Sequence, residues 1–150
     1  MKTIFMETTK ISPTITVGQI QKLLGEHGAT HILMEYDNGE VSGLVFNVRG
    51  PIEDMPFRLP CRWKAILEIF NARENKISTH RRWTKRSDWE GQAKRVAWRQ
   101  ILRWIEAQLA MTETGMVKIQ EVFMPYLIVD KNKTLYEKLE STKFQLEYKK

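Results

Sequence analysis

Apolar residues recur at helical spacing over the stretch 87–113, which predicts a long central helix. They cover more than half of the helix circumference, so we expect the helix to be buried on two sides. Ser87 and Glu90 form a capping-box pattern that predicts the helix start. The apolar set consists of Ala97, Trp98, Ile101, Leu102, Trp104, Ile105 and Leu109.

A different pattern, typical of strands, lies nearer the N-terminus. Residues 30–36 and 41–49 are extended apolar stretches, and between them Asn38-Gly39 supplies the two positive φ values of a type I′ hairpin turn. Residues 52–59 predict a third antiparallel strand, and Pro56 within it favours an edge position. Together these stretches predict a three-stranded antiparallel meander.

Shorter helices are predicted on both sides of the meander. Residues 17–24 have the pattern of a short helix, with a capping box at Thr16 and Gln19 and a C-cap at Gly25. An amphipathic helix is predicted over 62–72, and short helices over 117–124 and 134–139. Residues 2–9 are interpreted as an edge strand.

These elements predict an α+β fold. It has a short N-terminal helix, a three-stranded antiparallel meander, an amphipathic helix, a long central helix and short C-terminal helices. The length of 150 residues is typical of one domain, so we expect a single domain over 1–150. Within it, 73–88 is interpreted as a basic arm or loop, and 141–150 as a frayed tail.

The positive charge of the chain is concentrated in one region. Between residues 73 and 103 there are ten lysines and arginines and three acids, a net charge of +7, whereas the rest of the chain carries −1. Concentrated positive charge attracts phosphate and other polyanions. The sequence therefore predicts a polyanion-binding surface in this region.

The basic arm interleaves cations with an aromatic side chain. In single-stranded nucleic acid sites, cations follow the phosphates while an aromatic ring stacks on a base. The alternative is that Trp83 and Trp89 pin the loop to the core while the charges are solvated. The candidate binding residues here are Arg81, Arg82, Trp83, Lys85, Arg86 and Trp89.

Arg95, Arg99 and Arg103 stand four residues apart and form one predicted cationic stripe, open to solvent, on the central helix. Like charges at this spacing repel each other by a few tenths of a kcal/mol, which favours an anionic partner. The alternative is that these arginines pair with carboxylates such as Glu68, Glu106 or Glu113.

Signals for catalysis are poor, so we expect a non-enzymatic protein without cofactors or metal. The three histidines and Cys61 lack metal-ligand spacing, and no glycine-rich phosphate loop is present. Cys61 is interpreted as a small buried residue rather than a thiol of lowered pKa. No apolar run approaches the about 20 residues of a membrane span, which predicts a cytoplasmic protein without membrane contact.

Several stretches resemble a family of small phage and prophage proteins of uncharacterised function. The resemblance rests on 96–110, Met116-Val117, 121–126, 134–137 and 16–43. It implies a phage-encoded protein in the host cytoplasm, which either handles viral nucleic acid or disarms a host defence. It supplies no catalytic residues.

The sequence therefore predicts a phage-type protein that binds nucleic acid, single-stranded DNA or RNA rather than duplex. No helix-turn-helix or zinc-finger pattern favours sequence-specific duplex binding. The alternative function is an anti-defence protein that sequesters a phosphorylated nucleotide signal or inhibits a host nuclease. A homo-oligomer is compatible with either function.

Overall fold

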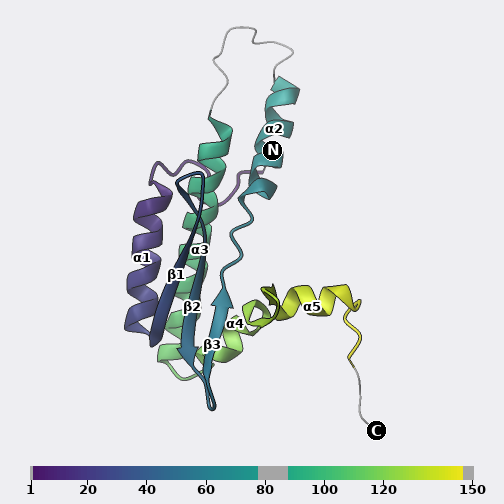
Figure 1. Cartoon of the computed structure of the whole chain (residues 1–150). Helices are drawn as coiled ribbons and strands as arrows, with labels where there is room; N and C mark the ends of the chain where they lie inside the picture. Colours follow the sequence, from purple (N-terminus) through teal and green to yellow (C-terminus); the bar gives the residue numbers. More distant parts are fainter. Residues whose placement is uncertain (1, 78–87, 147–150) are drawn as a thin grey trace. The chain divides into compact units, whose positions relative to one another are not determined.

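The computed structural model describes residues 2–77 and 88–146 (Figure 1). It confirms the predicted α+β fold, with its N-terminal helix, meander and long central helix. The elements are α1 (Pro13–Glu26), β1 (Ala29–Asp37), β2 (Glu40–Arg49), β3 (Asp54–Arg58), α2 (Trp63–Ile77), α3 (Trp89–Glu113), α4 (Ile119–Phe123), the 3-10 helix η1 (Met124–Tyr126), β4 (Ile128–Asp130), β5 (Lys133–Thr134) and α5 (Leu135–Ser141).

The chain forms two compact units. The first contains Met1–Ile20 and Cys61–Ile105, and the second contains Gln21–Pro60 and Glu106–Lys150. Helices α1 and α3 contribute residues to both. The expectation that residues 1–150 form one domain stays a prediction.

The first unit has its core where α2 meets the N-terminal part of α3. Phe70, Ala93 and Val96 are buried there. Half-buried apolar side chains surround them, namely Ile4, Trp63, Ile66, Leu67 and Trp89. The predicted amphipathic helix is therefore present, but it continues to Ile77, beyond the predicted end at residue 72.

The N-terminal segment is a turn, and the predicted edge strand over 2–9 is wrong. The Glu7 N–H donates to the Ile4 carbonyl, and Met6 has a φ of +64°. Two glutamines of α3 donate hydrogen bonds to backbone carbonyls of this segment, as the N–H groups of a neighbouring strand would have done. Gln92 Nε2 donates to the carbonyls of Glu7 and Thr9 at 2.7 and 2.9 Å, and Gln100 Nε2 donates to that of Phe5 at 2.8 Å.

Helix α1 is longer than predicted at both ends. It begins at Pro13, where the fixed φ of proline suits the first helical position, and the Ser12 carbonyl accepts from the Thr16 N–H. The capping box predicted at Thr16 is therefore wrong, and Thr16 is buried inside the helix. Gly25 also lies within the helix, and Gly28, with a φ of +97°, follows its end.

Helix α3 starts at Trp89, after Asp88. The Asp88 Oδ1 accepts from the Gly91 N–H at 2.9 Å, as an N-capping side chain does. A Cβ on Gly91 would lie 2.1 Å from Asp88 Oδ2, so a larger residue at this position would require the exposed Asp88 side chain to shift. Ser87, the predicted capping residue, lies outside the described residues.

The meander of the second unit follows the prediction closely, with strand order β1-β2-β3 (Figure 1). Asn38 and Gly39 have φ values of +50° and +80°, as a type I′ turn requires. Leu44, Phe46 and Val48 of β2 are buried on one face. As predicted, β3 is an edge strand that contains Pro56.

Three aromatic rings form the centre of the second unit. Phe46 stacks on Phe57 with ring centroids 5.4 Å apart, and Phe123 of α4 meets Phe46 edge-on at 5.3 Å.

Pro125 lies in η1, directly after α4, where a short helix was predicted to end. Gly115, with a φ of +76°, follows the end of α3.

Candidate nucleic-acid interface

The basic arm is bounded by two helices of the first unit. Helix α2 ends at Ile77 and α3 begins at Trp89. The predicted range of the arm, 73–88, begins too early, because residues 73–77 belong to α2. The candidate residues Arg81, Arg82, Trp83, Lys85 and Arg86 lie outside the described residues, so their role stays a prediction.

Trp89 is held in a packed position beside the arm. Its ring lies 5.2 Å from that of Phe70, and its Nε1 donates to Glu74 Oε2 at 2.8 Å. Both partners belong to α2, so this side chain joins the last turns of α2 to the first turn of α3. These contacts favour the packing alternative for Trp89, because its ring already packs against Phe70 and its Nε1 is hydrogen-bonded.

Two further cations of the basic region have partners. Arg73 of α2 forms an ion pair with Glu7 and donates to the Lys2 carbonyl at 2.7 Å. Lys94 lies 3.1 Å from Glu90 Oε1, and its Nζ is 4.8 Å from the ring centre of Trp63. Both cations stabilise the first unit, which leaves less of the regional charge for an external ligand.

Arg95 is half-buried against its own helix. Its Nε and Nη2 donate to Gln92 Oε1 at 3.0 and 2.8 Å. The amide of Gln92 therefore joins two groups, because its nitrogen binds the N-terminal segment while its oxygen orients Arg95. Gln92 was not among the predicted site residues, and its position beside the arginines was the only signal.

Arg99 is buried, so the predicted open stripe over Arg95, Arg99 and Arg103 is wrong at its centre. Only 4% of Arg99 is exposed, and its Nη1 donates to Gln19 Oε1 of α1 at 2.6 Å. Among the residues that the structure describes, its Nε has no hydrogen-bond partner, and neither has the hydroxyl of buried Thr16. An unexposed guanidinium cannot contact the backbone of a nucleic acid.

Arg103 is the member of the stripe that is exposed. It lies one turn beyond Arg99 on α3, where the helix still belongs to the first unit. The described part of the candidate interface therefore consists of Arg103 and half-buried Arg95. Trp89 and Arg99 serve the packing of the unit.

Two further kinds of candidate site remain, a thiol at Cys61 and a metal site. Burial raises the pKa of Cys61 to about 12, although a hydrogen bond from the backbone of Trp63 opposes this shift, and the thiol is therefore protonated. The interpretation of Cys61 as a small buried residue rather than a thiol of lowered pKa is right about the pKa, whereas the residue as a whole is half-buried. Among residues 2–77 and 88–146, no group of three or more His, Cys, Asp and Glu side chains is placed to hold a metal ion.

His27 follows α1 in the second unit and lies between two acceptors. Its Nδ1 is 2.7 Å from the Leu23 carbonyl oxygen, and its Nε2 is 2.6 Å from Glu113 Oε1. Burial lowers the pKa of His27, but these two hydrogen bonds and the charges of Glu113 and Glu26 raise it by more. The net effect is a pKa above the usual value, which favours the imidazolium.

No family model, curated protein or solved structure matches this chain. The resemblance to small phage proteins therefore stays a prediction. None of the described helices is long and apolar enough to cross a lipid bilayer.

Proposed function

We propose that this chain is a non-enzymatic, phage-type protein that binds single-stranded nucleic acid through the basic segment between α2 and α3. The observation that carries the proposal is the uneven charge, a net +7 between residues 73 and 103 in a chain that is otherwise nearly neutral. Phosphate contacts supply most of the affinity of non-specific nucleic acid binding. A regional excess of cations is the feature that such binding requires.

The helices on either side of the segment support this proposal. Trp89 contacts Phe70 and Glu74, so the end of α2 and the start of α3 are tied together beside the segment. A basic segment with both ends tied to one unit has less conformational entropy to lose on binding than a free tail. Trp83 is the aromatic side chain assigned to base stacking, because Trp89 is engaged in packing.

The set of proposed contacts is narrower than the set of basic residues. Arg81, Arg82, Lys85 and Arg86 contact phosphates, and Arg103 extends the surface along α3. Arg99 is excluded because it is buried against Gln19, and Arg73 because it pairs with Glu7. Arg95 contributes only charge at a distance while it is bound to Gln92.

A fluorescence anisotropy titration tests the proposal. The probes are labelled single strands of DNA and RNA, and the matching duplex, of about 20 nucleotides, which exceeds the about 4–16 that single-strand-binding folds cover. We expect tighter binding to the single strands than to the duplex, and affinity that falls steeply with salt. Failure to bind any strand at low salt would contradict the proposal. A parallel titration uses labelled cyclic nucleotides, and binding of these alone would favour the anti-defence function.

A further inference from the structure

Strand β1 forms an open edge of the three-stranded sheet. It has nine residues, Ala29–Asp37, and pairs with β2 on one side only (Figure 1). In the part of the chain that the structure describes, no backbone group bonds to its other side. A long strand edge of this kind is a template for pairing with another chain.

The opposite edge of the sheet is protected. Strand β3 is only five residues long, contains Pro56, and is covered at Phe57 by a bridge to Leu127. Short length, proline and covering segments are the devices with which natural sheets prevent edge pairing. The sequence of β1 contains no proline, lysine or arginine.

The middle of β1 pairs regularly with β2, and its sequence is similar in character on the two sides of Leu33. Register shifts lie between Ala29 and His31 and between Glu35 and Tyr36, so the stretch 31–35 pairs with β2 without interruption. It reads His-Ile-Leu-Met-Glu, with Leu33 at its centre. The residues on either side of Leu33 are therefore apolar, and the next pair outward is an imidazole and a carboxylate.

We propose that a second copy of this chain pairs with β1 in antiparallel orientation about a two-fold axis at Leu33. In this register Leu33 lies opposite Leu33 of the second copy, Ile32 lies opposite its Met34, and His31 lies opposite its Glu35. The two sheets then join into one continuous sheet, and each edge strand covers the other.

Apolar burial favours this register. Ile32 and Met34 pair with Phe46 and Leu44 of β2, so their side chains lie on the buried face, yet both are only half-buried. Leu33, on the other face, is 62% exposed. Pairing two copies covers all three side chains further, and opposed apolar side chains are the units that stabilise antiparallel pairs.

Charge complementarity also favours a second copy as the partner. Within one chain, His31 Nδ1 lies 3.9 Å from Asp54 Oδ2, and Glu35 Oε1 accepts from Arg58 Nε at 3.2 Å. The proposed pairing places His31 beside Glu35 of the second copy. Across the interface, Asp54 and His31 of one copy are then followed by Glu35 and Arg58 of the second copy, so that acidic and basic groups alternate. The two-fold symmetry produces this row twice.

Sedimentation equilibrium tests the proposal on the intact chain, at concentrations from about 1 to 200 µM that bracket affinities typical of small interfaces. We expect a monomer–dimer equilibrium in the wild type and at least tenfold weaker association in Leu33→Lys. Because Leu33 is exposed in the monomer, this variant should fold normally. Ile52→Lys makes the same change at a side chain that is 97% exposed and away from β1, and it should associate like the wild type.

Disulfide trapping tests the register. Opposed positions in antiparallel strands have Cβ atoms about 4.5–5.5 Å apart, close to the separation in a disulfide. Under mild oxidation, Leu33→Cys should form a covalent dimer, whereas Ile52→Cys should not. A wild type that stays monomeric at the highest concentration, or a dimer that Leu33→Lys leaves unchanged, would overturn the proposal.

Discussion

Arg99 Nη1 donates a hydrogen bond to Gln19 Oε1 at 2.6 Å, which joins the middle of α3 to α1. Arg99 is 4% exposed, and its Nε has no hydrogen-bond partner in the described part of the chain. A buried guanidinium that donates to a neutral amide is an unfavourable arrangement, because the amide offers no opposite charge. Arg99 therefore belongs to the packing of the first unit rather than to its binding surface.

Arg99→Glu should lower the free energy of unfolding by about 3–5 kcal/mol, because it buries a carboxylate without a cation. Arg99→Met keeps the length of the side chain and removes the buried charge, so its unfolding free energy should stay within about 1 kcal/mol of the wild type. Urea unfolding measures both values. Arg103→Glu, one turn away and exposed, is the control and should change stability by less than about 1 kcal/mol.

The same variants separate packing from binding. Arg99→Met should bind single-stranded oligonucleotides as the wild type does, since a buried side chain makes no phosphate contact. Anisotropy titrations beside the unfolding curves check this result. A fully stable Arg99→Glu variant would show that Arg99 is not buried, and would return it to the candidate interface.

His27 predicts a pH dependence of stability. Its folded-state pKa is raised, because both ring nitrogens face acceptors, the Leu23 carbonyl and Glu113, and only the imidazolium donates to both. A raised pKa contributes stability that is fully present below the unfolded value of about 6.5 and is lost as pH rises through the folded value. Hydrogen bonding to Glu113 therefore stabilises the second unit most at acidic pH.

The measurement is the difference in unfolding free energy between the wild type and Glu113→Gln, from about pH 5 to pH 9. We expect this difference to be largest at the acidic end and to shrink as His27 loses its proton. In a chain that already carries His27→Gln, the substitution Glu113→Gln should change the unfolding free energy by an amount that does not vary with pH. A difference that grows with pH would contradict the assignment of His27 as the proton-binding group.

Cys61 should be unreactive in the folded protein. Burial raises the pKa of its thiol to about 12, so very little thiolate exists near neutral pH, and the thiolate is the nucleophile. A disulfide reagent added at about pH 8 should label Cys61 slowly in buffer and rapidly in denaturant. Equal rates in the two solvents would mean that the thiol is exposed.

Local signals predicted most of the fold. The hairpin follows from Asn38-Gly39, because only a few residues adopt positive φ without strain, and the long helix follows from the spacing of its apolar residues. The start of α1 was predicted less well, because Thr16 and Ser12-Pro13 both resemble a helix start. The helix begins at Pro13, and Thr16 is buried within it.

The candidate site was harder to predict, because its contacts join distant parts of the sequence. Arg95, Arg99 and Arg103 have the spacing of an exposed stripe, and nothing local reveals that Gln19 meets the central one. The pairing of Arg73 with Glu7 is equally remote in sequence. Regional charge indicates which class of ligand to test, but only the fold shows which cations are already engaged.

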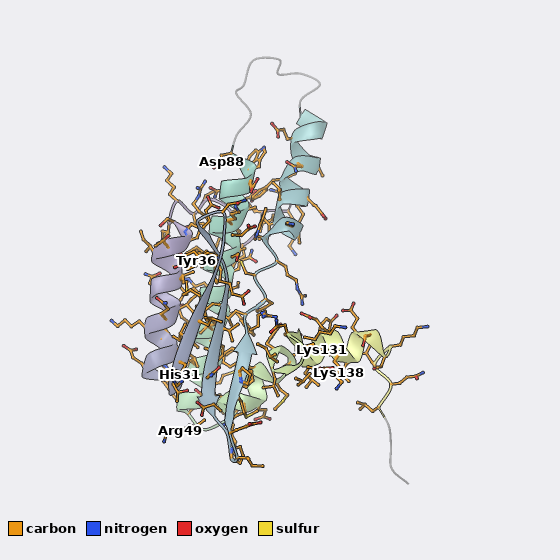
Figure 2. All side chains as sticks on the ribbon, viewed as in Figure 1. His31, Tyr36, Arg49, Asp88, Lys131 and Lys138 are labelled. Atoms are coloured by element: carbon orange, nitrogen blue, oxygen red, sulfur yellow. The ribbon has the colours of Figure 1, made fainter. Side chains whose placement is uncertain are left out.

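The central claim is that the basic segment binds single-stranded nucleic acid, and one comparison of salt dependence tests it most directly. The quadruple variant replaces Arg81, Arg82, Lys85 and Arg86 with alanine. Its matched control replaces four exposed cations of the second unit with alanine, namely Lys131 and Lys138 (labelled in Figure 2), Lys133 and Lys143. Both variants lose four positive charges, so a difference in affinity between them cannot be due to net charge alone.

Anisotropy titrations with a labelled single strand give the slope of log affinity against log salt for the wild type and both variants. Each lost phosphate contact should reduce the slope by roughly 0.7. We predict a much weaker affinity and a shallower slope for the arm variant, and values near the wild type for the control. An arm variant that folds and binds like the wild type would contradict the account.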